Sequence, residues 1–415
     1  MWWRDKRQLR RFALDLVLHR LAIQKPGARL PSPSSAALAQ KWSDSPLNLD
    51  SLELVESATF FAQALYITET GLEDLLLAQP SLNGWVEIAS DSLEQYHDHV
   101  SFFSSGSTGE PAQHKQPIQH LINEADFLKE LLQSQSALGQ PARIWSLVPA
   151  HHIYGFIFTV LLPERLGPDT EVIDARARLL TSIERSLQPG DILVAVPEFW
   201  QRWVSTGMRL PPGCKVVTAA GPSNNETLRQ LISQGATLLE IYGSSETAGL
   251  GYRHSPDTSL TLMPHWTING DKAQSTFLSA ELPDRLEWSD REHFMVAGRK
   301  DKAVQLAGVN VYPDKIAALI CTHEAVAQAA VRLHGQRLKV FIVPDKHWPD
   351  TGGSISELSI FDPASLEHQL RHWLSTQLPA GHIPAHFSFG DDLPRNAMGK
   401  LADWPIDNMS EPQVR

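Results

Sequence analysis

The stretch from Val100 to Pro111 constrains the fold more than any other part of the sequence. It opens with apolar residues typical of a short buried strand and runs into a loop that reads SSGSTG. A helical pattern follows, and its apolar face is formed by Leu121, Ala125, Leu128 and Leu132. Glycines let a backbone approach a ligand, and the amides and hydroxyls of such a loop donate well to phosphate oxygens. The pattern predicts a strand, a phosphate-binding loop and a helix.

On composition alone, the favoured alternative is an ordinary turn rich in serine and glycine. The loop is not a Walker loop, because no Gly-Lys-Ser/Thr follows it at the required spacing. Further motifs have to decide between these two interpretations.

Three later motifs favour phosphate binding. They are YGSSET at 242–247, GRKD at 298–301 with Gly308 downstream, and LPRNAMGK at 393–400. In this order, the four motifs resemble the adenylate-forming superfamily, which includes acyl- and aryl-CoA synthetases, luciferases and the adenylation domains of peptide synthetases. The resemblance spans about three quarters of the chain.

Length, net charge and cysteine content limit the class of protein. A chain of 415 residues is too long for one core and indicates two or three domains. A net charge of −11 argues against nucleic acid as a partner. The two cysteines, Cys214 and Cys321, form neither a disulfide framework nor a zinc spacing, which favours a reducing, cytoplasmic compartment. The basic start is interpreted as a helix, and no apolar run is long enough to span a membrane.

The patterns divide the chain into three parts, and together these predict an α/β, multi-domain fold. Residues 1–98 carry helical stripes, the first of them formed by Leu9, Phe12, Ala13, Leu16 and Val17, and are expected to form a helical domain. Residues 99–298 alternate between strands and helices, which predicts a large α/β core. Its strands are expected at 144–148, 191–196, 215–218 and 237–241, and its helices at 198–205 and 225–234. Residues 299–415 are expected to form a small, mobile α+β domain with a hairpin at 331–343 and an amphipathic helix.

The helical part contains Asp50-Ser51-Leu52 at an expected helix start. Helix, long loop and Asp-Ser-Leu resemble an acyl carrier protein, in which the serine carries phosphopantetheine. The resemblance would make Ser51 an attachment site. A capping box formed by Asp50 and Glu53, with a carrier-like domain kept for packing or docking, is the favoured alternative.

The superfamily resemblance implies roles in ATP binding. It implies that the loop of Ser104, Ser105, Gly106, Ser107, Thr108 and Gly109 wraps the β- and γ-phosphates, although Ala112 stands where the pattern has lysine and Lys115 lies just beyond. Glu246 would bind Mg²⁺, a hard ion that prefers oxygen ligands. The remaining ATP-binding residues it implies are Ala220, Gly221, Tyr242, Gly243, Ser245, Asp284 and Arg299.

The C-terminal motifs imply the catalytic lysine, the hinge and the loop for thioester formation. Lys400 would be the catalytic lysine, a long cation that bridges the carboxylate and the α-phosphate as charge shifts. The small domain would rotate about a hinge at Asp301 and bring the loop with Gly308 into the site for thioester formation. Gln305 and Lys315 depart from the family pattern near this loop.

The segment PAHHIYG at 149–155 resembles 4-coumarate–CoA ligases. By itself, a histidine in such a turn is more often a packed core residue. The resemblance makes His152 a catalytic and substrate-site residue and adds Tyr154 and Gly243 to the substrate site. Compact bacterial aryl-acid ligases are the most similar group, so a hydroxycinnamic or hydroxybenzoic acid is the expected substrate.

Three functions stay open at this point. The first is an aryl-acid–CoA ligase that uses ATP, Mg²⁺ and CoA. The second is an aryl-acid–carrier-protein ligase that loads a separate acyl carrier protein or a phosphopantetheine on its own Ser51. The third is a carrier-like docking protein whose adenylation fold only binds nucleotide, against which Glu246, Arg299 and Lys400 speak.

Overall fold

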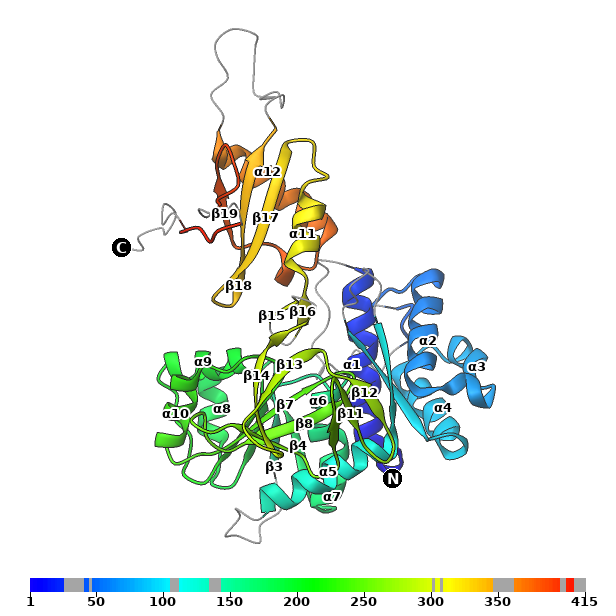
Figure 1. Ribbon diagram of the computed structural model, residues 1–415. Helices are drawn as coiled ribbons and strands as arrows, with labels where there is room; N and C mark the ends of the chain where they lie inside the picture. The colour runs from blue at the N-terminus through cyan, green and yellow to red at the C-terminus, as the bar shows by residue number, and fades with distance from the viewer. Residues whose placement is uncertain are drawn as a thin grey trace. The chain divides into compact units, whose positions relative to one another are not determined.

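The computed structural model forms two compact units, residues 1–301 with 307–309 and residues 302–306 with 310–415 (Figure 1). It describes residues 1–25, 41–44, 47–104, 112–133, 143–300, 303–306, 309–345, 362–395 and 401–406.

The first unit begins with the helices α1 (Lys6–Gln24), α2 (Ser51–Leu65), α3 (Glu73–Ala78) and α4 (Leu82–Gln95). Asp5 caps α1, because its side chain accepts from the amide of Arg7. Asp50 and Glu53 form the expected capping box at the start of α2. The predicted stripe on α1 is buried at all its positions: Leu9, Phe12, Ala13, Leu16 and Val17.

A nine-stranded sheet organises the unit, in the order β13-β14-β9-β8-β7-β6-β5-β3-β4. Its parallel half is β4 (Glu171–Asp174), β3 (Arg143–Ser146), β5 (Ile192–Ala195), β6 (Lys215–Thr218) and β7 (Thr237–Ser244). Its antiparallel half continues through β8 (Ala248–Arg253), β9 (Leu260–Leu262), β14 (His293–Arg299) and β13 (Asp284–Trp288). The strands predicted near 144, 191, 215 and 237 are confirmed.

The inner parallel strands β3, β5, β6 and β7 are buried on both faces, as crossover helices require, whereas the edge strand β4 is partly exposed. Alternate residues point into different cores: Ile144, Val217 and Leu239 belong to one, and Trp145, Val216 and Leu238 belong to the other. The second core also contains residues of α8 (Leu180–Ser186), α9 (Pro197–Ser205) and α10 (Asn225–Ser233). The first contains residues of α5 (Ile118–Gln133), α6 (Ile153–Phe156), the following π-helical turn at 157–161 and α7 (Leu162–Leu166).

The N-terminal helices share the first of these cores. Trp2 and Phe12 contact Phe156, at ring-centroid distances of 5.0 and 4.9 Å. The carboxylate of Asp15 in α1 accepts from the amide of Ala150, at 2.6 Å. The structure therefore differs from the expectation of a separate helical domain at 1–98, because these residues bury their apolar faces against the α/β core.

Two smaller sheets complete the first unit. An antiparallel pair, β1 (His99–Ser104) and β2 (Ala112–Pro117), flanks the predicted phosphate loop and leads directly into α5. The predicted apolar face of α5 is confirmed, because Leu121, Ala125, Leu128 and Leu132 are all buried. A three-stranded antiparallel sheet comprises β10 (Thr267–Asn269), β11 (Lys272–Gln274) and β12 (Ser279–Glu281).

The second unit is α+β, as predicted. The expected hairpin is β17 (Val326–His334) with β18 (Arg337–Pro344), and β19 (His386–Phe389) pairs with β18 in parallel. The helices α11 (Pro313–Ile320) and α12 (Pro363–Gln377) contribute Ile316, Ile320, Leu366, Leu370 and Leu374 to its core. Two short strands, β15 (Val304–Leu306) and β16 (Val309–Val311), pair with each other. Within the described residues, no helix is both long and apolar enough to cross a membrane.

Candidate active site

Asp284, Arg299 and Tyr242 come together at one end of the antiparallel strands. Asp284 opens β13 and lies opposite Arg299, the last residue of β14. The hydroxyl of Tyr242 in β7 donates to Asp284 Oδ2 at 2.6 Å, and Arg299 Nη1 lies 4.0 Å from Oδ1. Burial, followed by the charge of Asp284, raises the pKa of Tyr242 well above its ordinary value, so the hydroxyl stays protonated and donates. Oδ1 of Asp284 is buried and has no hydrogen-bond partner among the described residues.

The turn that follows Tyr242 is held by its own side chains. Ser244 Oγ lies 3.1 Å from Thr247 Oγ1, and the amide of each residue also donates to the other's hydroxyl. A Cβ on Gly243 would lie 1.9 Å from the carbonyl oxygen of Ala248, so only glycine fits where β7 meets β8. The turn therefore has one defined conformation, and it exposes 37% of the Glu246 side chain.

Strand β2 braces this turn from the side. Gln116 Nε2 donates to the carbonyl oxygens of Ser245 and Glu246, at 2.7 and 3.0 Å. His114, two residues earlier and on the same face of the strand, has its Nδ1 3.8 Å from a Glu246 carboxylate oxygen. Sequence reasoning missed both residues, although period-two alternation along the strand was the available signal.

The same alternation directs Lys115 to the opposite face of β2. Its Nζ lies 5.0 Å from the ring centroid of Tyr66, whose hydroxyl is 2.8 Å from Ser101 Oγ. Lys115, just beyond the phosphate loop, is the candidate to substitute in charge for the lysine that the loop lacks. The structure instead pairs it with an aromatic ring, and His114 is the basic residue beside Glu246.

The predicted adenine turn follows β6. Ala220 has φ of 66°, a left-handed conformation that is uncommon for a residue other than glycine. It bends the chain at the carboxyl end of a parallel strand, where ligands of α/β sheets commonly bind. The hydroxyls of Thr218 and Ser223 flank this turn, and both are buried without a hydrogen-bond partner among the described residues. Polar groups are therefore available on both sides of Ala220 and Gly221.

A cluster of three histidines adjoins the expected acid-binding segment. His19 of α1 stacks on His151 with ring centroids 4.4 Å apart, and His151 lies 4.2 Å from His152. Both ring nitrogens of His151 are buried without a hydrogen-bond partner among the described residues. Burial lowers the pKa of His19 and of His152 to about 4. The cluster therefore consists of neutral imidazoles at neutral pH, and His19 is a member that no local sequence motif pointed to.

Tyr154 lies one residue beyond the start of α6, on the same segment as His152. Its hydroxyl donates to the carbonyl oxygen of Ala195 at the end of β5, at 3.2 Å, and its ring contacts Phe158. Burial raises the pKa of the phenol well above its usual range, so it remains a donor. The hydroxyl is thus engaged with the sheet, and the ring is what Tyr154 can offer to a substrate.

Acid is expected to destabilise the fold through the histidine cluster. Since His19 and His152 have pKa values of about 4 in the fold, against an ordinary 6.5, the unfolded chain binds more protons between these values. Their contribution is intact above pH 6.5 and is lost as the pH falls toward 4, by roughly 3 kcal/mol for each ring. Melting temperatures measured from pH 8 to 4 should fall less steeply for His19→Phe than for the wild type.

The exposed His293 supplies the control for this experiment. It pairs with Asp290 on the surface, with Nδ1 2.9 Å from the carboxylate, and 43% of its side chain is exposed. His293→Phe should keep the wild-type pH profile. A His19→Phe profile parallel to the wild type would mean that the cluster does not govern acid stability.

Several predicted site residues lie outside the described residues. They are Ser105, Gly106, Ser107, Thr108, Gly109, Asp301, Gly308 and Lys400. For Ser104 the backbone closes β1, opposite Ala112 of β2. The described strands β1 and β2 flank the phosphate loop. The roles of the undescribed residues named above remain predictions.

Ser51 is described and exposed at the first turn of α2. The capping interactions of this helix are made by Asp50 and Glu53, at 2.8 and 3.0 Å, so the Ser51 hydroxyl takes no part in the capping box. Leu52 beside it is 68% exposed. The tripeptide therefore caps a helix and at the same time leaves its serine accessible.

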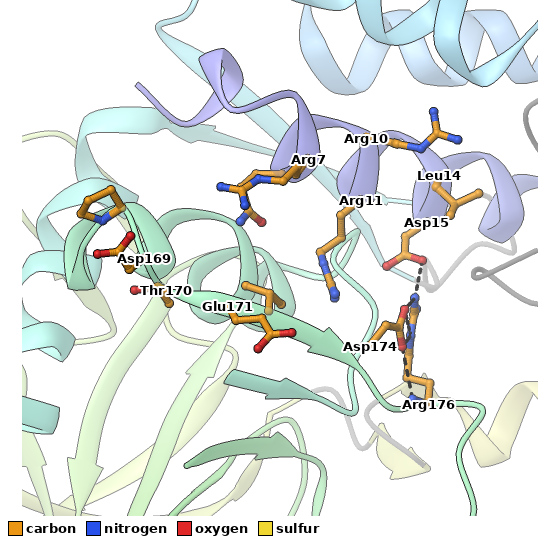
Figure 2. A pocket seen from close by; sticks show the side chains of 13 residues that line it. Arg7, Arg10, Arg11, Leu14, Asp15, Asp169, Thr170, Glu171, Asp174 and Arg176 are labelled. Carbon is orange, nitrogen blue, oxygen red and sulfur yellow. Dashed lines mark hydrogen bonds and ion pairs between the residues drawn. The ribbon is translucent and has the colours of Figure 1, made fainter. Parts of the chain in front are cut away.

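A separate cavity of about 620 Å³ lies between α1 and the segment at 168–176 (Figure 2). Arg7, Arg10 and Arg11 line it from the helix, and Asp169, Glu171 and Asp174 line it from the other side. Arg176 crosses to α1, where its Nη2 lies 2.8 Å from Asp15 Oδ1. None of the cavity's lining residues was predicted to be functional, and the Asp15–Arg176 ion pair links α1 to the segment after β4.

Comparison with known proteins assigns the family. The model of the AMP-binding enzyme family matches residues 70–270, and the model of the AMP-binding enzyme C-terminal domain matches residues 315–400. A 4-coumarate–CoA ligase from Halorhodospira halophila is 35% identical over 370 residues, which are 86% of this chain and 88% of that protein. A second 4-coumarate–CoA ligase, from Cereibacter sphaeroides, is 33% identical over 398 residues, 92% of this chain and 90% of its own.

The fold agrees with this assignment. A solved structure of o-succinylbenzoate CoA synthetase from Bacillus subtilis superposes with a TM-score of 0.55 at 18% identity, covering 73% of this chain and 67% of that one. Three of the four motifs, the phosphate loop and the segments at 242–247 and 393–400, fall within the residues that the two family models match, and Asp284 and Arg299 lie between the two matched ranges. The chain therefore belongs to the AMP-binding, adenylate-forming enzyme family and is an AMP-forming acid–thiol ligase that uses ATP and Mg²⁺.

Proposed function

We propose that this ligase activates an aromatic carboxylic acid, a hydroxycinnamic or hydroxybenzoic acid, as its acyl-adenylate and transfers the acyl group to CoA. Similarity to 4-coumarate–CoA ligases over most of the chain supports the acid class and the acceptor. The single structural observation that carries the nucleotide step is the buried Oδ1 of Asp284, which faces Arg299 at 4.0 Å and has no hydrogen-bond partner among the described residues. An orphaned carboxylate oxygen is costly unless a ligand donates to it.

The residues present fit the nucleotide. Asp284, held by the hydroxyl of Tyr242, would accept from ribose hydroxyls, and Arg299 opposite it would contact ribose or phosphate. The ring of Tyr242 and the bend at Ala220 and Gly221 would flank the adenine. Each of these groups lies at the end of a strand, where its backbone is fixed before the ligand arrives. Such preorganisation reduces the entropic cost of binding.

The residues also fit Mg²⁺. This ion keeps several waters and binds through one or two carboxylates together with substrate phosphates. Glu246 offers one partly exposed carboxylate on a turn that Gln116 and the Ser244–Thr247 pair hold in place. When bound, the ion would neutralise phosphate charge. The neighbouring Ser245 would donate to the α-phosphate, and His114 would add a donor on the side of β2.

The histidine cluster supports the acid half of the proposal. His152 precedes α6, and neutral imidazoles can line an apolar acyl site without desolvating a charge. His152 and Tyr154 would border the aromatic acid, and Gly243 would let the ring approach the β7 backbone. His19 and His151 stack behind His152 and would fix the position of its ring.

Replacing Lys400 should separate catalysis from binding. A cation delivered to the carboxylate and α-phosphate stabilises charge that develops in the transition state, and loss of one such group lowers kcat by about 100- to 1,000-fold. Lys400→Ala should lose adenylate formation to this extent, measured by pyrophosphate exchange, while ATP binding by calorimetry stays within a few-fold of the wild type. Lys129→Ala on the surface of α5 is the control, and unchanged turnover in Lys400→Ala would remove this lysine from the mechanism.

The proposal is tested by a product screen. The purified protein is given ATP, Mg²⁺, CoA and a panel of hydroxycinnamic, hydroxybenzoic and fatty acids, and products are identified by mass spectrometry. An aryl-CoA is the expected product. Fatty acyl-CoA as the dominant product would overturn the aromatic assignment, and accumulation of an aryl-adenylate alone would overturn CoA as the acceptor.

A second candidate function is an aryl-acid–carrier-protein ligase. The exposed Ser51, whose hydroxyl is not used in capping α2, favours it, since a phosphopantetheine attachment site needs an accessible serine at a helix start. Intact-mass analysis after incubation with CoA and a phosphopantetheinyl transferase decides this point. A mass increase that Ser51→Ala abolishes supports loading of the chain itself, and an unchanged mass removes Ser51 as the acceptor.

A further inference from the structure

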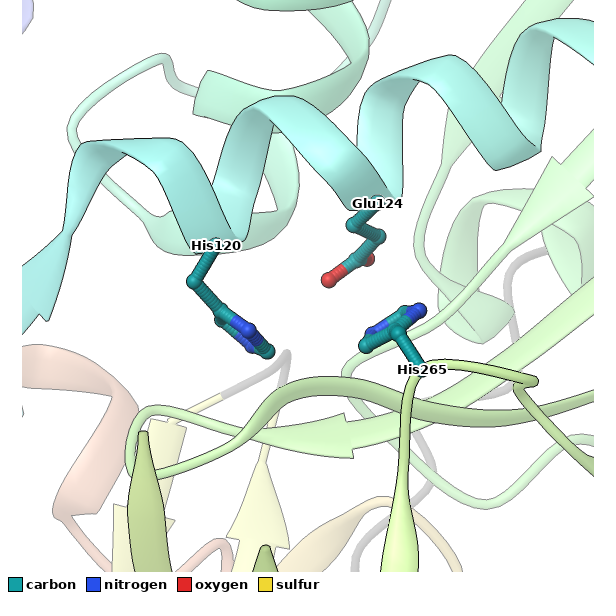
Figure 3. Close-up of side chains that lie close together, drawn as sticks. All are labelled: His120, Glu124 and His265. Atoms are coloured by element: carbon teal, nitrogen blue, oxygen red, sulfur yellow. The ribbon is translucent and has the colours of Figure 1, made fainter. Parts of the chain in front are cut away.

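Behind the turn that carries Glu246 lies a cluster of three side chains that the proposed function does not use: His120, Glu124 and His265 (Figure 3). One potential ligand atom from each residue lies within 4.8 Å of those of the other two. All three belong to the first unit. Two imidazoles and a carboxylate that converge in this way are an unusual filling for a protein core.

The backbone explains why the three side chains meet. His120 and Glu124 are separated by one turn of α5, so they project from the same face of the helix. His265 lies between β9 and β10, and the neighbouring Trp266 is anchored because its indole donates to the carbonyl oxygen of Gly249, at 2.8 Å. His120 also contacts the rings of His265 and Trp266, at centroid distances of 5.3 and 4.8 Å. The cluster is therefore built from two segments far apart in the sequence.

Glu124 is buried without a positively charged partner among the described residues. Only 1% of the residue is exposed, and the amide of Gly249 donates to its Oε2 at 2.9 Å. An isolated buried carboxylate is expensive, and a bound divalent cation would supply the missing opposite charge.

The two histidines have lone pairs to offer. His120 Nε2 donates to the carbonyl oxygen of Thr247 at 3.2 Å, which leaves Nδ1 as the nitrogen with the lone pair, 3.2 Å from Ser275 Oγ. A histidine that ligates a metal commonly donates its other N–H to a backbone carbonyl in this manner. His265 has a buried Nε2 without a hydrogen-bond partner among the described residues.

We propose that His120, Glu124 and His265 form a binding site for a divalent transition-metal ion, with Zn²⁺ as the ion that suits two imidazoles and one carboxylate. In a tetrahedral zinc site the ligand atoms lie about 3.3 Å apart, so small side-chain rotations would close the cluster. The partial exposure of His265 gives an ion a route from solvent. This site lies apart from the Mg²⁺ that Glu246 would bind.

The location gives the ion a structural consequence. His120 bonds to Thr247 and Glu124 to Gly249, so the cluster joins α5 to the β7–β8 connection where β8 begins. An ion bound there would fix this connection, and with it the turn that presents Glu246. The site would therefore stabilise the fold and hold the nucleotide-binding turn without touching ATP.

The test is metal binding to the nucleotide-free, full-length protein after treatment with a chelator. The wild type should bind one equivalent of Zn²⁺ by calorimetry and elemental analysis, and its melting temperature should rise with added Zn²⁺. Co²⁺ should give a visible ligand-field absorption. Glu124→Gln keeps the acceptor for Gly249, and His265→Gln changes a partly exposed residue. Each should bind Zn²⁺ at least about 100-fold more weakly than the wild type.

Two further variants separate this site from its alternatives. Glu246→Gln should keep Zn²⁺ binding, because it changes only the proposed Mg²⁺ ligand. His293→Ala removes a surface His–Asp pair and should also leave Zn²⁺ binding unchanged. Circular dichroism and melting in chelator verify that Glu124→Gln and His265→Gln are folded. Equal Zn²⁺ affinity in the wild type and in both cluster variants, or no binding at micromolar Zn²⁺, would overturn the proposal.

Discussion

Asp284→Ala is expected to lower kcat/KM for ATP by roughly 10²- to 10⁴-fold, as two hydrogen bonds to a charged acceptor are lost. The structure supplies the physical reason. Asp284 is 7% exposed, Tyr242 and Arg299 flank its carboxylate, and Oδ1 has no hydrogen-bond partner among the described residues. A ribose that donates to this carboxylate would meet an acceptor that is already desolvated and oriented. The measurement is pyrophosphate exchange at varied ATP, together with AMP binding by calorimetry.

Asp284→Asn refines this experiment. The amide keeps the shape and one oxygen acceptor but loses the charge, so its effect should fall between those of the wild type and Asp284→Ala. Asp257→Ala is the matched control, because Asp257 is an exposed aspartate paired with Arg229 at 2.6 Å. Nucleotide affinity and kcat/KM that stay within a few-fold of wild type in Asp284→Ala would show that this carboxylate does not bind the ribose.

Asp15→Ala is expected to lower the free energy of unfolding by about 3 kcal/mol. Its carboxylate is 2% exposed and joins three parts of the first unit, because it lies in α1, accepts from the amide of Ala150 and pairs with Arg176 at 2.8 Å. Without this carboxylate, the buried amide of Ala150 has no acceptor, and Arg176 keeps only its ion pair with Asp174. Burial raises the pKa of Asp15 despite Arg176, which shows how strongly the site excludes water. Urea denaturation measures the loss.

Asp169→Ala provides the control for Asp15. It removes an exposed carboxylate from the lining of the same cavity, and it should change stability by no more than about 0.5 kcal/mol. Asp15→Asn keeps an acceptor for the amide of Ala150, so its free energy of unfolding should lie between those of Asp15→Ala and Asp169→Ala. A stability of Asp15→Ala equal to that of Asp169→Ala would mean that water replaces the carboxylate and that α1 is not held by this residue.

The Asp15 link also bears on function. Ala150 immediately precedes His151 and His152, so the N-terminal helix positions the turn that would border the acid. A carrier-like domain that folds by itself would not need this contact. The helices at 1–98 instead bury Trp2, Phe12 and Leu16 against the α/β core. In their Asp-Ser-Leu tripeptide, Asp50 takes part in a capping box and Ser51 stays accessible.

Local patterns were sufficient for most of the secondary structure. Strand β6 has the predicted bounds, Lys215–Thr218, and α9 and α10 differ from the predicted helices by one residue at one end. The hairpin predicted around 331–343 is β17 with β18, and Leu333 lies opposite Leu338. These elements follow from hydrophobic periodicity, capping residues and turn residues, which all act within a few positions along the chain.

The site was harder to predict because its contacts join distant segments. Gln116 lies 129 residues from Ser245 in sequence, and His120 lies 155 residues from Ser275, yet each pair is within hydrogen-bonding distance. The YGSSET motif was sufficient to predict Tyr242 and Glu246 as site residues. The motif did not indicate that His114 of β2, and not Lys115, lies beside Glu246, because this depends on how β2 pairs with β1. His19 shows the same limit, since its stacking on His151 depends on how α1 packs.

Motif spacing and periodicity are properties of neighbouring residues, so the family, the α/β class and the order of the chemical motifs could be predicted before the fold was known. Three features emerged only in the folded chain: the N-terminal helices share the core, Oδ1 of Asp284 lacks a hydrogen-bond partner among the described residues, and His120, Glu124 and His265 converge. These features depend on burial and on contacts over long sequence separations. No local pattern encodes them, since desolvation and pairing arise only when the chain has closed on itself.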